Sequence, residues 1–107
     1  MNIELIIQLL NALKTEQPTQ ESAFEVGKMY VVRTLTMTTT GKLIRITPQE
    51  LVFSDAAWIA DSGRWNEFVC NPEATAKEVE MYSRNCIVGR VSVIDATEIT
   101  TLPKATK

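Results

Sequence analysis

The sequence predicts one mainly β domain over residues 1–107, in which an N-terminal α-helix precedes five strongly bent antiparallel strands. Three observations predict this class. Apolar residues recur at helical spacing near the start, β-branched and aromatic residues alternate with polar ones from residue 28, and Gly41 and Gly89 interrupt two apolar strands. With 45% hydrophobic and 22% charged residues, the composition is typical of a soluble globular domain with one core.

The helix is predicted over about residues 3–15. Asn2 is an available N-cap, and Glu4 lies where the helix dipole favours a negative charge. The apolar residues that recur at helical spacing are Ile3, Ile6, Ile7, Leu10 and Leu13. Their wide stripe must lie against a hydrophobic surface, either the sheet of the same chain or a neighbouring subunit. A polar connector with Pro18 then leads to the strands.

The strands are predicted from alternation and from the turn residues between them. A strongly bent sheet covers about residues 28–102, and an ordered excursion at about 60–77 contains one helical turn near 64–69. We expect strands at 28–40, 43–46, 50–55, 78–82 and 86–94, with a turn at 47–49. The tryptophans of this region, Trp58 and Trp65, are interpreted as packing residues rather than as a platform for nucleobases.

The composition excludes several classes of function. The chain has no histidine and two cysteines, which removes the common Ser-His and Cys-His pairs and leaves too few ligands of these types for a zinc site. We therefore predict no enzyme activity, no metal and no cofactor. The net charge of -2 gives no overall field that attracts polyanions, no apolar run is long enough for a bilayer, and the acidic start is unlike a signal peptide. A cytoplasmic location without membrane contact is expected.

Two segments resemble the motifs of the Sm-like (LSm) family. Residues 41–56 combine a glycine, an alternating apolar strand, a tight turn and a second apolar strand, as in the first Sm motif. Residues 86–94 place Gly89 inside an apolar strand, as in the second. With their flanking strands these segments cover about two-thirds of the chain. The resemblance is to a divergent member, of the kind seen in some phage or mobile-element proteins.

The resemblance implies a small five-stranded Sm-like barrel, assembled as a homo-oligomeric ring of about five to seven copies whose face binds single-stranded RNA or a nucleotide. The residues that match the RNA-binding turns are Thr47, Gln49, Gly89 and Arg90. Thr47 stands where the family has an aspartate, and Arg90 follows the glycine instead of preceding it. The usual uridine pocket is therefore not reproduced, and neither turn holds an aromatic residue for stacking.

Ring assembly would pair the strand at 78–82 of one copy with the strand at 86–94 of the next. The candidate interface residues are Val79, Met81, Ile87, Val91 and Val93. The alternative function is a structural or adaptor ring that binds protein partners, without nucleic acid, through its helix face and the excursion at 60–77.

Overall fold

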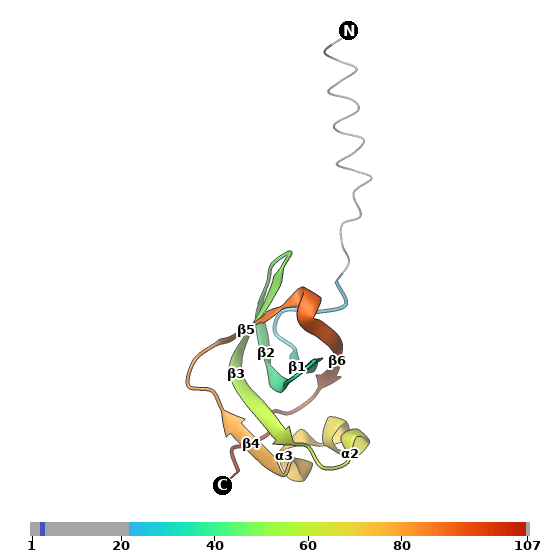
Figure 1. Cartoon of the computed structure of the whole chain (residues 1–107), viewed down its shortest axis with the longest axis vertical. Coiled ribbons are helices and arrows are strands. Elements are labelled where there is room, and N and C mark those ends of the chain that lie inside the picture. The colour runs from blue at the N-terminus through green and yellow to red at the C-terminus, as the bar shows by residue number, and fades with distance from the viewer. Residues whose placement is uncertain (1–2, 4–21, 107) are drawn as a thin grey trace.

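The computed structural model describes residue 3 and residues 22–106 (Figure 1). The predicted helix over residues 3–15 therefore lies outside the described residues, apart from Ile3. The described elements are β1 (Met29–Thr34), β2 (Thr38–Ile46), β3 (Glu50–Asp61), α2 (Trp65–Cys70), α3 (Pro72–Thr75), β4 (Glu78–Met81), β5 (Cys86–Gly89), the 3-10 helix η1 (Arg90–Ser92) and β6 (Val93–Ile99). The mainly β class is confirmed.

All six strands belong to one antiparallel sheet. Its main order is β4-β3-β2-β1-β6, and β5 pairs with β3 off this path. The long β3 strand pairs with β2 along one edge and with two strands along the other: its first residues, Glu50 to Phe53, pair with β5, and its last, Ala57 to Asp61, pair with β4. This division of β3 places the β4 edge and the β5 edge at different ends of the sheet.

The predicted closed five-stranded barrel is wrong. The sheet has six strands and is open, because β5 pairs with β3 and β6 pairs with β1, while β5 and β6 are not paired with each other. The α-helices described within residues 22–106 follow β3 instead of preceding β1. The helical turn expected inside the excursion is confirmed as α2.

Two of the predicted strands are divided by turns. The segment 86–94 is interrupted by η1, where the Ser92 hydroxyl donates a hydrogen bond to the Gly89 carbonyl at 2.6 Å. The segment 28–40 is interrupted at residues 35–37, where the Thr34 N–H donates to the Met37 carbonyl at 2.8 Å. The Met37 N–H in turn donates to the Thr34 hydroxyl at 3.1 Å. Threonine therefore supplies this turn without glycine or proline.

Gly41 lies inside β2, where the neighbouring strand bends. Thr40 faces Ala57 and Lys42 faces Ser54, so β3 carries extra residues opposite Gly41. Asp55, within this bulge, has a φ of 51°. A Cβ at Gly41 would lie 2.7 Å from Phe53 Cβ, so the close approach of the two strands requires glycine.

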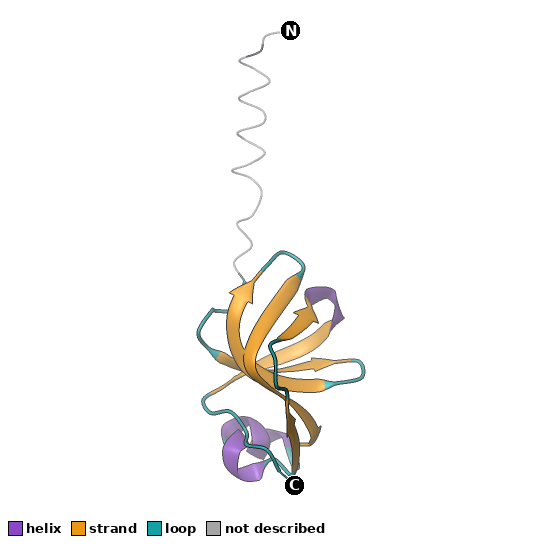
Figure 2. Ribbon diagram, turned by 90° about the vertical axis from the view of Figure 1, so that its left-hand side faces the viewer, coloured by secondary structure: helices purple, strands orange, loops and turns teal. Residues whose placement is uncertain are grey.

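Hydrophobic clusters lie on both faces of the sheet. Tyr30 and Val32 of β1 belong to the first cluster, and Val31 between them belongs to the second, as strand alternation requires. The fully buried Phe68 of α2 belongs to the second cluster, and Figure 2 shows α2 and α3 at the end of the strands near the C-terminus. The complete second cluster is Val31, Ala57, Ile59, Phe68, Val79 and Ile99.

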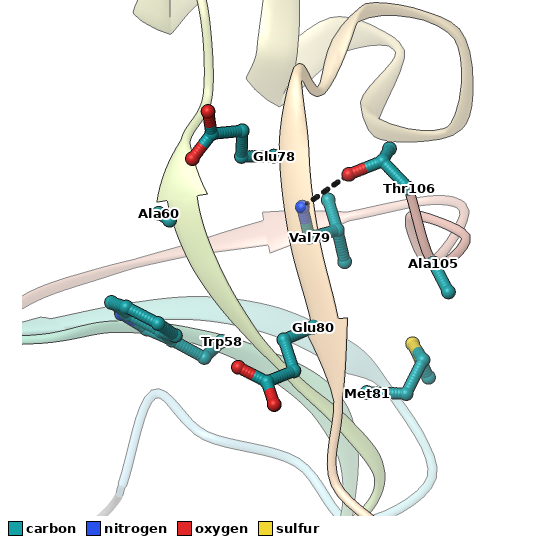
Figure 3. Close-up of a pocket in the computed structure, with 8 residues that line it drawn as sticks. All are labelled: Trp58, Ala60, Glu78, Val79, Glu80, Met81, Ala105 and Thr106. Carbon is teal, nitrogen blue, oxygen red and sulfur yellow. Dashed lines mark hydrogen bonds between the residues drawn. The ribbon is translucent and has the colours of Figure 1, made fainter.

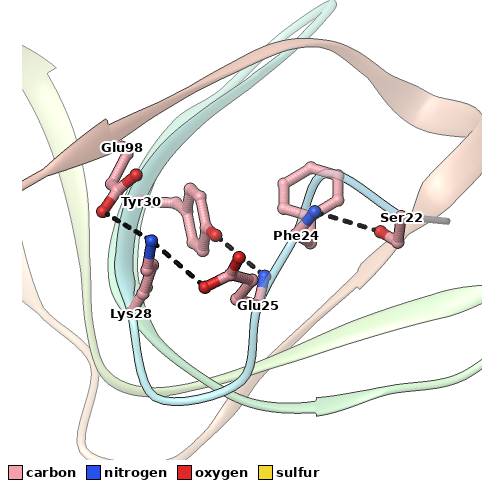
Figure 4. Close-up of polar contacts among 6 residues, drawn as sticks. All are labelled: Ser22, Phe24, Glu25, Lys28, Tyr30 and Glu98. Atoms are coloured by element: carbon pink, nitrogen blue, oxygen red, sulfur yellow. Dashed lines mark hydrogen bonds and ion pairs between the residues drawn. The ribbon is translucent and has the colours of Figure 1, made fainter.

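The chain enters the sheet through a small polar network (Figure 4). The Glu25 N–H donates to the Tyr30 hydroxyl at 2.9 Å, and the Tyr30 ring packs edge-on against Phe24 at 5.2 Å between centroids. Lys28 bridges Glu25 and Glu98 at 3.1 and 3.4 Å, and these hydrogen bonds raise the pKa of its ammonium group. The bridge ties the start of β1 to β6.

Candidate functional site

The residues predicted to bind RNA lie side by side at one corner of the sheet. Gly89 of β5 faces Glu50 of β3, directly after the turn that holds Thr47 and Gln49. The Arg90 N–H donates to the Gln49 carbonyl at 2.9 Å, and the Arg90 guanidinium donates to the Thr47 carbonyl at 3.2 Å. The structure therefore brings together two turns that are about forty residues apart in sequence.

Part of this corner is occupied by its own hydrogen bonds. The Thr47 hydroxyl accepts a hydrogen bond from the Glu50 N–H at 2.9 Å and donates one to the Glu50 carbonyl at 3.4 Å. The groups left for a ligand are the exposed Gln49 amide and the other donors of the half-buried Arg90 guanidinium. This combination suits a phosphate oxygen or a base edge and offers no stacking surface.

The predicted interface residues differ in their exposure. Val79 is 4% exposed and Val93 is half-buried, and both side chains pack into the clusters of their own chain. Met81 is 39% exposed, Ile87 is 62% exposed, and Val91 is fully exposed. The side chains available to a second copy are therefore Met81, Ile87 and Val91, and the ring stays a prediction.

A hollow in the described structure surrounds the edge of β4 (Figure 3). It has a volume of about 700 Å³ and lies between the end of β3, β4 and the last described residues of the chain. Its lining residues are Trp58, Ala60, Glu78, Val79, Glu80, Met81, Ala105 and Thr106. The hollow thus combines an aromatic ring, two carboxylates and apolar side chains along one strand edge.

The backbone of this edge is partly used by the chain itself. The Val79 N–H donates to the Thr106 hydroxyl at 2.8 Å, and the Thr106 N–H donates to the Val79 carbonyl at 3.1 Å. The Tyr82 N–H points the other way, to the Ala56 carbonyl of β3. Because peptide groups alternate in direction along a strand, the Met81 N–H and carbonyl point outward like those of Val79. Within residues 22–106, β3 is the one strand that pairs with β4.

The two faces of β4 differ in character. Figure 3 shows Glu78 and Glu80 on the same side as Trp58 and Ala60, and Val79 and Met81 on the other. Glu80 is directly opposite Trp58 in the strand register. Neither Glu78 nor Glu80 belongs to any of the four ion pairs among the described residues. The outer face therefore presents two exposed carboxylates beside an aromatic ring.

Two ion pairs lie near the helices. Arg33 forms a bidentate ion pair with Asp95, and its guanidinium lies 4.4 Å from the centroid of the Trp65 ring. Hydrogen bonding to Arg33 lowers the pKa of the Asp95 carboxyl. Lys104 pairs with Glu73 at 2.8 Å and so fixes the C-terminal segment against α3. Arg33 thus links β1 and β6 to Trp65 of α2, and Lys104 links the final segment to α3.

Both cysteines are free thiols. Cys70 at the end of α2 is exposed, while Cys86 of β5 is half-buried, and burial raises the pKa of its thiol. No group of three or more potential metal-ligating side chains occurs in the described part of the chain. A helix long and apolar enough to cross a membrane is likewise not found there.

Sequence reasoning did not identify the hollow at β4. The alternation of Glu78, Val79, Glu80 and Met81 predicted a strand, and Trp58 was interpreted as a packing residue. The one feature of the sequence that could have indicated this site is that carboxylates occupy every second position of a short strand.

No protein-family model, curated protein or solved structure matches this chain.

Proposed function

We propose that this chain is a protein-binding module that takes up an extended segment of a partner protein along the edge of β4. The observation that carries the proposal is the pair of hydrogen bonds between Val79 and Thr106. In one of them the Thr106 backbone N–H donates to the Val79 carbonyl, and in the other the Thr106 hydroxyl accepts from the Val79 N–H, so the outward peptide groups of β4 hold a segment of chain beside the strand. The next outward-facing peptide groups, those of Met81, border the hollow.

Strand addition at an open sheet edge is a common mode of peptide recognition, because backbone hydrogen bonds supply affinity and side-chain pockets supply specificity. The β4 edge has both components. Met81 offers an outward N–H and carbonyl, and the hollow of about 700 Å³ provides room for the side chains of an added strand. The proposal keeps protein binding from the adaptor alternative predicted from sequence, but assigns it to the β4 edge, next to the excursion at 60–77, instead of to the helix face of a ring and the excursion itself.

The test compares two substitutions at one position. Met81→Pro removes the outward N–H, and proline is tolerated on an edge strand, whereas Met81→Ala keeps the N–H and shortens only the side chain. The probes are fluorescein-labelled eight-residue peptides in which valine alternates with lysine, glutamine or glutamate, measured by fluorescence anisotropy. We expect at least one peptide to bind, with affinity at least tenfold weaker for Met81→Pro and within about threefold of wild type for Met81→Ala. Equal binding by all three proteins would refute strand addition at this edge.

We propose RNA binding at the opposite corner as a second candidate function, because Thr47, Gln49 and Arg90 gather there from separate turns. The Arg90 guanidinium donates one hydrogen bond, to the Thr47 carbonyl, and retains further donors for a phosphate. Arg90→Ala should weaken binding of a uridine-rich ten-nucleotide RNA several-fold at low salt, while Arg84→Ala serves as a charge-matched control at an exposed turn. Identical affinities for the two variants would exclude a role for this corner.

A further inference from the structure

The partner segment at β4 has a defined chemistry. Resting on the function proposed above, we infer that this segment is basic, with lysine or arginine at alternate positions and small apolar residues between them. The inference concerns the side chains that line the hollow, whereas the proposed function concerns the backbone edge, so the two can fail separately.

The spacing follows from strand geometry. Side chains alternate between the two faces of a strand, so every second residue of a segment added beside β4 lies on the face of Glu78 and Glu80. Residues directly opposite or diagonal on neighbouring strands are close enough for their side chains to interact. Thr106 lies beside Val79, between the two carboxylates, so a segment that runs past both of them takes the place of Thr106 there. Two cations at positions i and i+2 of this segment then match Glu78 and Glu80.

The charge follows from the surroundings of these carboxylates. Glu78 and Glu80 have no ion-pair partner within residues 22–106, and both are exposed. Trp58 lies opposite Glu80 and also lines the hollow. A lysine or arginine side chain placed there would meet a carboxylate and the face of an indole ring together, which favours cations through ion pairing and the ring quadrupole. An acidic segment would meet two like charges.

The intervening positions face different side chains. Val79, Met81 and Ala105 line the other part of the hollow, and all three are apolar. Val79 is already packed in the second cluster, so Met81 and Ala105 remain as the apolar contacts for an incoming strand. Small apolar residues such as valine fit these positions because they pack on apolar neighbours and favour the strand conformation.

The experiment measures affinities of the three alternating peptides, with lysine, glutamine or glutamate between valines, for the full chain at 50 and 500 mM salt. We expect the lysine peptide to bind at least tenfold more tightly than the glutamine peptide, and the glutamate peptide to bind most weakly. High salt should reduce the preference for lysine, because exposed charge pairs are screened.

Two charge-matched variants locate the effect. The double variant E78K/E80K should reverse the order, so that the glutamate peptide becomes the tightest ligand. E50K/E67K makes the same change in net charge at exposed positions that do not line the hollow, and it should keep the original order. A reversed order in E50K/E67K as well would assign the preference to bulk charge and overturn the inference.

The outcomes separate the two proposals. Equal binding of lysine and glutamine peptides that still depends on the Met81 N–H would overturn the basic-segment inference and support the proposed function. Binding of the lysine peptide that is lost in E78K/E80K but unaffected by Met81→Pro would support the charge preference and refute strand addition. Failure of all three peptides to bind at millimolar concentration would overturn both.

Discussion

Replacement of Gly41 by alanine tests the packing at the bend of the sheet. The new methyl carbon would lie 2.7 Å from Phe53 Cβ, 3.2 Å from Phe53 Cγ and 3.2 Å from the Ser54 carbonyl oxygen. Phe53 is 1% exposed, so its side chain has little room to move. Such overpacking costs about 1–3 kcal/mol, and the entropy gained by replacing glycine in a strand offsets up to about 1 kcal/mol. The expected net loss is about 1–2 kcal/mol.

The assay is thermal unfolding followed by circular dichroism, where a loss of this size lowers the Tm by about 5–15 °C for a domain near 100 residues. Gly89→Ala is the matched control. Its φ of -66° suits any residue, and the nearest atom to the new Cβ is Ser92 Oγ at 3.7 Å, an ordinary contact. Gly89→Ala should leave the Tm unchanged or raise it slightly. Equal losses at both positions would refute the close approach at Gly41.

Three further predictions concern burial and ionisation. Phe68→Ala should lower the free energy of unfolding by about 3–5 kcal/mol in urea titrations, since Phe68 is fully buried in the second cluster; a loss below about 1 kcal/mol would contradict this. Because Arg33 lowers the pKa of Asp95, the pair stabilises the fold above the ordinary aspartate pKa of about 3.9 and loses this effect as pH falls through the lower folded-state value. In Asp95→Asn, the Tm should therefore fall less than in wild type between pH 5 and about pH 2.5. The same dependence of Tm on pH in both proteins would refute a stabilising role of this pair. Burial raises the pKa of the Cys86 thiol, so Cys86 should react more slowly than the exposed Cys70 with a thiol-specific disulfide reagent at pH 8. Cys70→Ser should therefore remove the faster phase of the reaction, and one uniform rate in wild type would contradict this expectation.

The strand content was predictable because alternation is a local signal, whereas the turn at residues 35–37 was not. Leu35 and Met37 continue the alternating pattern of β1, and they are 88% and 38% exposed. The turn is instead closed by the hydroxyl and N–H of Thr34. Threonine is also common within strands, so its presence does not mark a turn. Gly41 was a misleading marker for a bend between strands, since it serves a close approach inside β2.

The corner of Thr47, Gln49 and Arg90 was predictable in part, because a resemblance between motifs supplied a long-range contact that local patterns do not contain. The family barrel implied by that resemblance is wrong nonetheless. Segment 86–94 has the composition of one continuous strand, but η1, with its Ser92–Gly89 hydrogen bond, interrupts it. After this turn β6 pairs with β1 instead of continuing β5.

The hollow at β4 depends on contacts that no local pattern reveals. Thr106 reaches Val79 across 27 positions in the sequence, and Lys104 reaches Glu73. Without these long-range contacts, Glu78 and Glu80 are ordinary exposed residues of a short strand. The sequence therefore identifies the two carboxylates and their spacing. Only the fold reveals that the Trp58 ring and outward-facing backbone groups lie beside them.

Charged side chains on an edge strand also protect a protein from unwanted strand pairing, so Glu78 and Glu80 have a second role to be weighed against recognition. The two roles are compatible because they act on different partners. When two copies of this chain approach edge to edge through β4, four carboxylates face one another and oppose pairing, whereas a basic strand neutralises them. Neutral E78Q/E80Q should therefore weaken binding of the lysine peptide and increase self-association measured by light scattering. If E78Q/E80Q changes self-association alone, the carboxylates protect the edge without selecting a partner.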